Sequence, residues 1–109
     1  LTLLEKRGDL PRLVLTHNPA TIRTLPPRQS VDLMIAGHTH GGQINLPVIT
    51  CAFFPSMCRL TLGGLVQTER GLVFVSTGTG MVILPMRLNA APRIDLIDLS
   101  YKACSLAVR

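Results

Sequence analysis

Three histidines follow two predicted strands, and their residue type and position favour metal chemistry. His17 comes directly after the short apolar run Arg12–Thr16, and His38 and His40 come after the run Val31–Ala36. Ligands of open α/β sheets bind beyond the carboxyl ends of the strands, so two parallel neighbours would bring the three imidazoles to one edge. Neutral imidazole is the commonest protein ligand for transition metals. Together these histidines predict a divalent metal site, whereas each alone would be read as a hydrogen-bonded loop residue.

The segments that position these histidines form a predicted β-α-β unit. Arg12–Thr16 and Val31–Ala36 are short apolar runs bounded by proline, glycine or polar turn residues, as buried strands are. Between them, Pro19–Leu25 is typical of a short helix with proline in its first turn, and Pro26-Pro27 ends that helix. We therefore expect the two strands to be parallel neighbours.

The rest of the chain is predicted to contain loops, short hairpins and strands. Gly41-Gly42 and Pro47 break the middle of the chain into loop and hairpin pieces. Turn residues then separate apolar runs that are typical of a second, partly antiparallel sheet. The predicted strands of that sheet are Leu60–Leu62, Leu65–Gln67, Leu72–Val75 and Ile94–Leu99. No element is predicted for Tyr101–Arg109, and Leu1–Arg7 is read as the end of a helix that Gly8-Asp9 closes.

Length and composition suit one small folded domain or part of a larger one. The chain has 109 residues, of which 47% are hydrophobic and 16% charged, and this composition excludes a disordered chain. The first residue is Leu1 rather than methionine. We therefore expect the sequence to be a segment of a longer protein.

The net charge of +5 raises the question of an anionic partner. The basic residues are dispersed, the only adjacent pair is Lys6-Arg7, and no basic run alternates with aromatic residues. This pattern is typical of a solvated surface with a mild positive bias, and we predict no binding of nucleic acid. It remains compatible with a site for anionic substrates such as phosphates.

Three cysteines leave the redox compartment open. An odd number of cysteines without a C-x-x-C pair does not indicate a disulfide scaffold. Cys51 and Cys58 could pair, but the sequence favours buried thiols.

Several motifs resemble those of one enzyme family. Gly37-His38-Thr39-His40-Gly41-Gly42-Gln43 resembles the G-H-x-H motif of calcineurin-like metallophosphoesterases, and Leu15–Pro19 resembles the single-histidine motif that precedes it. Residues 72–80 and 84–89 resemble the closing strands of one subgroup of that family. Members of this subgroup are membrane-associated or exported, and some are similar to UDP-2,3-diacylglucosamine pyrophosphohydrolases. The resemblance covers residues 10 to 99.

The resemblance implies a fold and a reaction. The fold would be the C-terminal half of a four-layer αββα sandwich, with a mixed β-sheet and few short helices, over residues 1–99, followed by a tail over 100–109. The cofactor would be two divalent metal ions (Mn, Fe, Zn or Mg), with His17 and His38 on one ion and His40 on the other. Such centres hydrolyse phosphoester or pyrophosphate bonds with an activated hydroxide.

The earlier motifs of the family, D-x-H, G-D-x-x-D and G-N-H, are absent from the sequence. Gly8-Asp9 is followed by Leu10-Pro11-Arg12 rather than by a second aspartate at the required spacing, so it is read as a turn. The carboxylates that would complete the metal centre are therefore missing. We expect this chain alone to be inactive, and the alternative is a binding or interaction module that keeps the scaffold without the catalysis.

The resemblance also suggests substrates and a location. Arg87, Gly78 and Gly80 are candidate substrate-binding residues, against the alternatives of a structural arginine and a plain strand-ending turn. The substrate would be a phosphorylated small molecule or a lipid-linked phosphate. Phe53-Phe54-Pro55 is read either as an apolar lip for a lipid or as core packing. A bacterial membrane-associated or exported parent is expected, with the membrane contact made by the region before Leu1.

Overall fold

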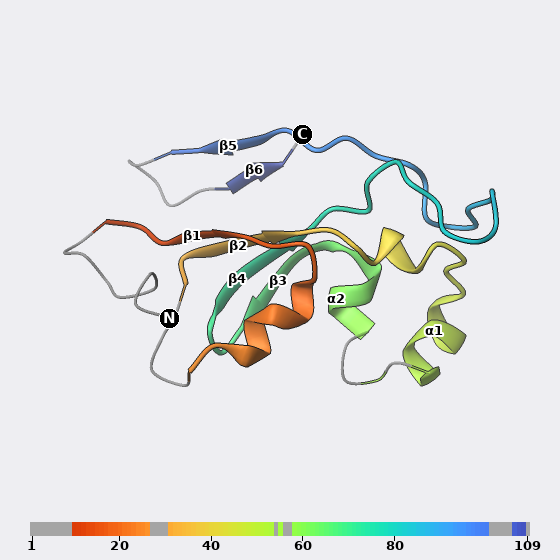
Figure 1. The fold of residues 1–109 in the computed structure, drawn as a ribbon, viewed down its shortest axis with the longest axis horizontal. Coiled ribbons are helices and arrows are strands. Elements are labelled where there is room, and N and C mark those ends of the chain that lie inside the picture. The colour runs from red at the N-terminus through yellow and green to blue at the C-terminus, as the bar shows by residue number, and fades with distance from the viewer. Residues whose placement is uncertain (1–9, 27–30, 54, 56–57, 101–105, 109) are drawn as a thin grey trace.

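The structure, a computed structural model, describes residues 10–26, 31–53, 55, 58–100 and 106–108. Its centre is a four-stranded mixed sheet with the strand order β1-β2-β4-β3 (Figure 1). The strands β1 (Leu13–Leu15), β2 (Leu33–Ala36) and β4 (Gly71–Val75) run parallel, and β3 (Gly64–Thr68) pairs with β4 antiparallel. The expected mixed α/β fold with few short helices is confirmed.

The predicted β-α-β unit forms one side of this sheet. β1 and β2 are parallel neighbours, and they are joined by η2 (Pro19–Thr24), a 3-10 helix. The Oδ1 atom of Asn18 caps η2 by accepting a hydrogen bond of 2.9 Å from the backbone N–H of Ala20. Pro19 opens the first turn of η2, where its missing N–H leaves no bond unmade. The prediction of two parallel strands linked by a short helix is confirmed.

The predicted second sheet is only partly correct. β3 and β4 contain the predicted strands Leu65–Gln67 and Leu72–Val75, but they belong to the same sheet as β1 and β2. Of Ile94–Leu99, only β5 (Ile97–Leu99) is a strand, and it pairs with β6 (Leu106–Val108) in a separate two-stranded sheet. Apolar runs mark strands without naming their partners, which explains the error. The predicted helix end at residues 1–7 and its closing turn at 8–9 lie outside the described residues.

Two short helices occupy part of the region predicted as loops and hairpins. They are α1 (Pro47–Phe53) and α2 (Cys58–Leu62). The predicted strand Leu60–Leu62 is therefore wrong, because a short apolar run does not by itself distinguish a strand from a helix. Gly63 and Gly64 separate α2 from β3 with φ angles of 90° and 91°, which glycine adopts without steric cost.

A disulfide between Cys51 and Cys58 joins α1 to α2. The two Cα atoms lie 4.9 Å apart, although seven positions separate the residues in sequence. The prediction of buried thiols at these two positions is therefore wrong. The two cysteines lie on helices that no sequence pattern predicted.

The disulfide predicts a specific labelling pattern. In denaturant without reductant, we expect iodoacetamide to alkylate one of the three cysteines of the chain, because disulfide sulfurs do not react with it. After reduction all three should be alkylated, as counted by intact mass spectrometry. The control is the Cys51→Ser variant, in which both remaining cysteines should react without reductant. Labelling of three cysteines in the unreduced protein after expression in an oxidising compartment would contradict the bond.

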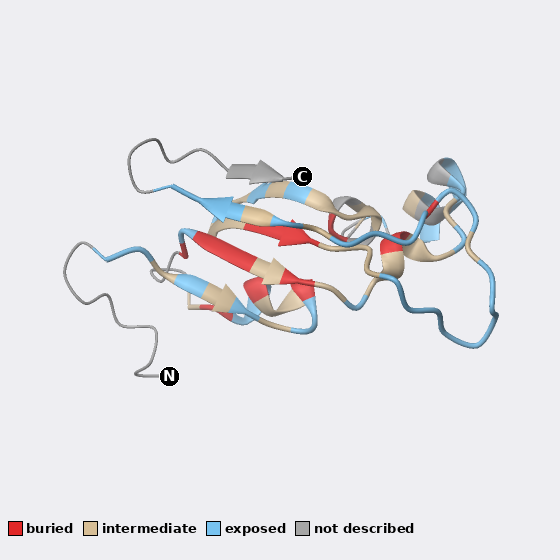
Figure 2. Ribbon diagram, turned by 90° about the horizontal axis from the view of Figure 1, so that it is seen from above, coloured by how far each residue is buried: buried red, intermediate tan, exposed pale blue. Residues whose placement is uncertain are grey.

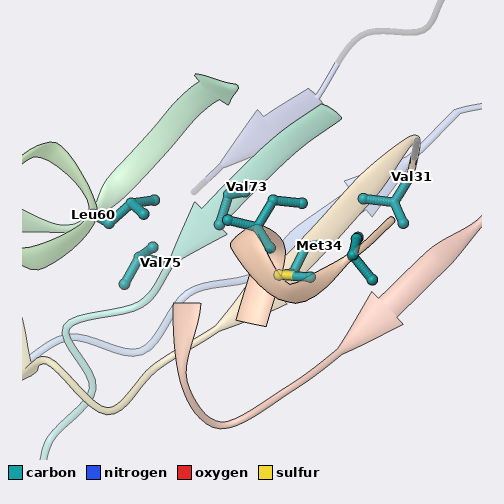
Figure 3. Packing of buried hydrophobic residues seen from close by; sticks show 7 residues of the cluster. Val31, Met34, Leu60, Val73 and Val75 are labelled. Carbon is teal, nitrogen blue, oxygen red and sulfur yellow. The ribbon is translucent and has the colours of Figure 1, made fainter. Parts of the chain in front are cut away.

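The hydrophobic core lies on the face of the sheet that η2 and α2 cover. Figure 2 shows that buried residues concentrate in the central strands β2 and β4. Side chains at alternating strand positions meet those of the helices and of the adjoining loops (Figure 3). The cluster consists of Ile22, Leu25, Val31, Met34, Leu60, Val73 and Val75.

The opposite face of the sheet is only partly covered. Phe74 is buried there, with the guanidinium carbon of Arg93 at 5.9 Å from its ring centroid. Leu13 and Leu15 on the edge strand β1 and Leu65 on β3 remain exposed. Among the residues that the structure describes, no helix is long and apolar enough to cross a bilayer.

Candidate metal centre

The three histidines lie where the sequence predicted, beyond the carboxyl ends of the parallel strands β1 and β2. Backbone hydrogen bonds extend the strand pairing to this point, since the N–H of Gly37 donates to the carbonyl of His17 at 3.1 Å. The histidines border one open cavity of about 480 Å³. The cavity is lined by His17, His38, Thr39, His40, Gly42, Gln43, Ile44 and Val82.

His17 and His38 face each other directly. Nε2 of His17 lies 2.8 Å from Nδ1 of His38, and the ring centroids lie 4.6 Å apart in an edge-to-face arrangement. Two ring nitrogens at this distance cannot both present bare lone pairs to one another, so either a proton or a cation must be shared between them. Both side chains are exposed, which leaves them accessible to an ion from solvent.

His40 lies on the same cavity but turns to different neighbours. Its Nδ1 atom is 3.3 Å from Oε1 of Gln43, and its Nε2 atom is 3.7 Å from the point where a Cβ at Gly80 would lie. Within the described part of the chain, no three His, Cys, Asp or Glu side chains gather closely enough to hold one ion. The three histidines therefore do not form a single group: His17 and His38 contact each other, and His40 contacts Gln43.

The backbone that carries His38 and His40 has an unusual conformation. The φ angles of His38, His40 and Gln43 are 70°, 52° and 50°, all in the left-handed region that L side chains rarely adopt. Gly41 and Gly42 share that region with φ angles of 64° and 82°. Such strain, about 1–3 kcal/mol for each non-glycine residue, concentrates at ligand sites.

Arg87, Gly78 and Gly80 differ in their surroundings, and none of the three lines the cavity. Each of the five N–H donors of the Arg87 guanidinium is directed at a backbone carbonyl oxygen, at distances between 2.6 and 3.3 Å. The acceptors are Thr77, Gly80, Ala90 and Ala91. Gly80 borders His40, and Gly78 takes a φ of 58° with open space around it. The phosphate contact of Arg87 stays a prediction. The donors that it would need are engaged with backbone carbonyls in this structure.

The predicted apolar lip at residues 53–55 divides into separate parts. Phe53 ends α1 with 76% of its surface exposed, so core packing does not apply to it. Phe54 lies outside the described residues. Pro55 borders a different cavity, of about 660 Å³, together with Ile22 and Arg70.

Gln43 is the residue of this site to which the sequence assigned no role. It closes the motif that begins at Gly37, and its side chain contacts both His40 and the segment Val82–Leu84. Its place directly after two glycines in a histidine motif was the available signal. The contacts themselves cross about forty positions of the sequence and could not be read from it.

Comparison with curated proteins gives several relatives. The chain is 34% identical over 92 residues to the phosphodiesterase YaeI of Escherichia coli. The aligned region covers 84% of this chain and 33% of that relative. It is 36% identical over 99 residues to the uncharacterized metallophosphoesterase YkuE of Bacillus subtilis, covering 90% and 34% respectively. A transmembrane protein with a metallophosphoesterase domain from Bos taurus is 38% identical over 93 residues, covering 84% and 20%.

These matches extend over most of this chain but over a smaller part of each relative. The chain spans about a third of the length of the two bacterial relatives and a fifth of the bovine one. No family profile matches the chain. No solved structure matches it either. The similarity to several named metallophosphoesterases over most of this chain supports its assignment to a region of the metallophosphoesterase family.

Proposed function

We propose that this chain supplies histidine ligands to the dinuclear centre of a metal-dependent phosphoesterase. His17 and His38 hold one divalent ion, and His40 holds the other. The observation that carries the proposal is the 2.8 Å approach of Nε2 of His17 to Nδ1 of His38 at the ends of two parallel strands. Facing ring nitrogens on adjacent strands are what a shared ion requires of two imidazole ligands.

The chemistry of the ligands narrows the choice of ion. Three imidazoles suit Zn or Fe better than Mn, which prefers oxygen ligands, or Mg, which also keeps several waters. When bound, divalent ions supply a water-derived nucleophile at neutral pH and offset the charge on phosphoryl oxygens. The chain's own contribution is to hold the imidazoles at the rim of one cavity, with their backbone fixed by the sheet.

The substrate class follows from the walls of that cavity. The lining includes two apolar residues, Ile44 and Val82, which are 38% and 56% exposed. Ile83, which follows Val82 in the sequence, is 96% exposed. An apolar rim next to a phosphate site suits a phosphoester or pyrophosphate that carries an apolar group. A phosphorylated small molecule or a lipid-linked phosphate is therefore the proposed substrate, hydrolysed by the whole protein.

The proposed location is a bacterial membrane or the space outside it. The disulfide between Cys51 and Cys58 supports this, because such bonds persist in oxidising compartments and are rare in the cytosol. The name of the bovine relative, a transmembrane protein with a metallophosphoesterase domain, agrees with a membrane-associated family branch. The membrane contact would be made by another region of the whole protein.

A Co²⁺ titration of the chain tests the metal assignment. We expect isothermal calorimetry to detect binding, and His17→Ala or His38→Ala to weaken it by more than about tenfold, the lower end of the loss caused by removing even an outer-shell partner. His40→Ala serves as the matched variant, because it should remove a second binding event and leave the first. Equal Co²⁺ affinity in all three variants and the unmodified chain would overturn the proposal.

An activity measurement separates this role from the alternative of a binding module. The chain alone, which lacks the carboxylate motifs, is expected not to hydrolyse bis(p-nitrophenyl) phosphate with added Mn²⁺ or Zn²⁺. In the whole protein the same assay should show metal-dependent turnover that His38→Ala removes. A whole protein that binds no metal and turns over no phosphoester would favour the binding module.

A further inference from the structure

The side chain of Gln43 uses its whole amide group to join two parts of the candidate metal centre. Nε2 donates to the carbonyl oxygens of Val82 and Leu84 at 2.9 and 3.0 Å. Oε1 accepts from the backbone N–H of Val82 at 2.7 Å and lies 3.3 Å from Nδ1 of His40. One amide thus pairs with a segment of backbone as a neighbouring strand would, and also meets an imidazole.

These partners fix the orientation of the Gln43 amide. The N–H of Val82 can only donate, so the atom that meets it is the oxygen. The two carbonyls can only accept, so the atom that meets them is the nitrogen. Since Oε1 can only accept, Nδ1 of His40 must carry the proton of this contact. In the neutral imidazole, Nε2 is then left with a free lone pair.

The main chain of Gln43 strengthens the same connection. Its N–H donates to the carbonyl of His40 at 3.1 Å, and its own carbonyl accepts from the N–H of Leu88 at 2.8 Å. Residue 43 therefore links His40 to both ends of the segment Val82–Leu88 through side chain and backbone together.

The side chains of the segment that Gln43 holds are poorly buried. From Met81 to Leu84 every side chain is about half exposed or more, and Ile83 has a left-handed φ of 63°. Burial of apolar surface therefore contributes little to its order. Val82 nevertheless lines the cavity beside the histidines, so the position of this wall depends on the Gln43 amide.

We propose that Gln43 is a positioning residue with two linked tasks. It holds His40 with the proton on Nδ1, so that Nε2 is the atom available to a metal ion, and it anchors Met81–Leu84 as one wall of the cavity. An outer-shell hydrogen bond of this kind sets the tautomer and orientation of a histidine ligand. The first task rests on the proposed function, whereas the second stands on the hydrogen bonds alone.

Two substitutions separate the tasks. Gln43→Met has a similar shape and removes every hydrogen bond of the amide. Gln43→Glu keeps an acceptor for His40 but cannot donate to the carbonyls of Val82 and Leu84. The matched control is Gln67→Met on β3, because among the described residues the Gln67 amide donates to the carbonyl of the adjacent Thr68 alone.

The readouts are the ¹⁵N shifts of the His40 ring, the deuterium exchange of the Val82 amide, protease cleavage within residues 81–84 and Co²⁺ affinity by calorimetry. In Gln43→Met we expect a mixed His40 tautomer, faster Val82 exchange and about tenfold weaker Co²⁺ binding. In Gln43→Glu we expect the Nδ1–H tautomer and Co²⁺ affinity to be kept while protease cleavage within residues 81–84 increases. Gln67→Met should change none of these.

The outcomes are distinguishable from failure of the proposed function. If the unmodified chain binds no Co²⁺, the metal assignment fails, and the tautomer and exchange measurements still decide the role of Gln43. If it binds Co²⁺ and both Gln43 variants keep the tautomer, exchange and affinity of the unmodified chain, the positioning role is overturned. Should Gln43→Met fail to fold by circular dichroism, an unchanged cleavage rate in Gln43→Glu would overturn it equally.

Discussion

Replacing Met34 with alanine is expected to lower the free energy of unfolding by about 2–5 kcal/mol, the range for truncating a fully buried methionine or leucine. Met34 lies on the central strand β2 with none of its surface exposed, and it belongs to the cluster between the sheet and the helices η2 and α2. The lost contacts leave a cavity that neighbouring strands cannot fill, because they are tied to β2 on both sides.

Urea denaturation followed by circular dichroism measures this loss. The control is Leu15→Ala on the edge strand β1, because 79% of the surface of Leu15 is exposed. That variant should change the free energy of unfolding by no more than about 0.5 kcal/mol. Equal destabilisation by the two substitutions would mean that the core does not lie on the face described.

Replacing Arg87 with alanine is expected to lower the free energy of unfolding by about 2–4 kcal/mol. Hydrogen bonds from a charged group contribute about 1.5–3 kcal/mol each, but five bonds made by one side chain do not add in full. The substitution frees the carbonyls of Thr77, Gly80 and Ala90 at once, and it releases the segment that connects β4 to β5. Lysine should not rescue the loss, because an ammonium cannot reproduce the planar set of five donors.

The same variant decides between the two roles considered for Arg87. A structural role predicts loss of stability, measured by urea denaturation, in the absence of any substrate. A phosphate contact alone predicts unchanged stability and weaker substrate binding. The comparison variant is Arg93→Ala, which removes an ion pair with the largely buried carboxylate of Asp95 and a contact with Phe74 but frees none of the carbonyls that Arg87 binds.

The β-α-β unit could be predicted because local signals agreed with the global arrangement. Two apolar runs, a proline at the start of the intervening helix and polar residues beyond each strand all pointed to the same structure. Parallel pairing then placed His17 beside His38 without further information. The position of the histidines at one edge was therefore available from the sequence, whereas the 2.8 Å contact required the structure.

The middle of the chain could not be predicted in the same way. Leu60–Leu62 is too short for its period to distinguish a helix from a strand. The roles of Gln43 and Arg87 were equally hidden, because their partners are backbone groups of loops whose course follows no periodic pattern. Glutamine and arginine in a loop have no residue pattern that identifies which carbonyl they will meet.

The left-handed backbone around His38 and His40 has a consequence for how the motif distributes its side chains. In an extended strand, residues two positions apart point to the same side. Here His38 turns to His17 on the neighbouring strand, and His40 turns to Gln43 and the Gly80 segment. Two imidazoles separated by one residue thus serve two different positions in the cavity, and the same sequence in an extended conformation would offer both to a single position.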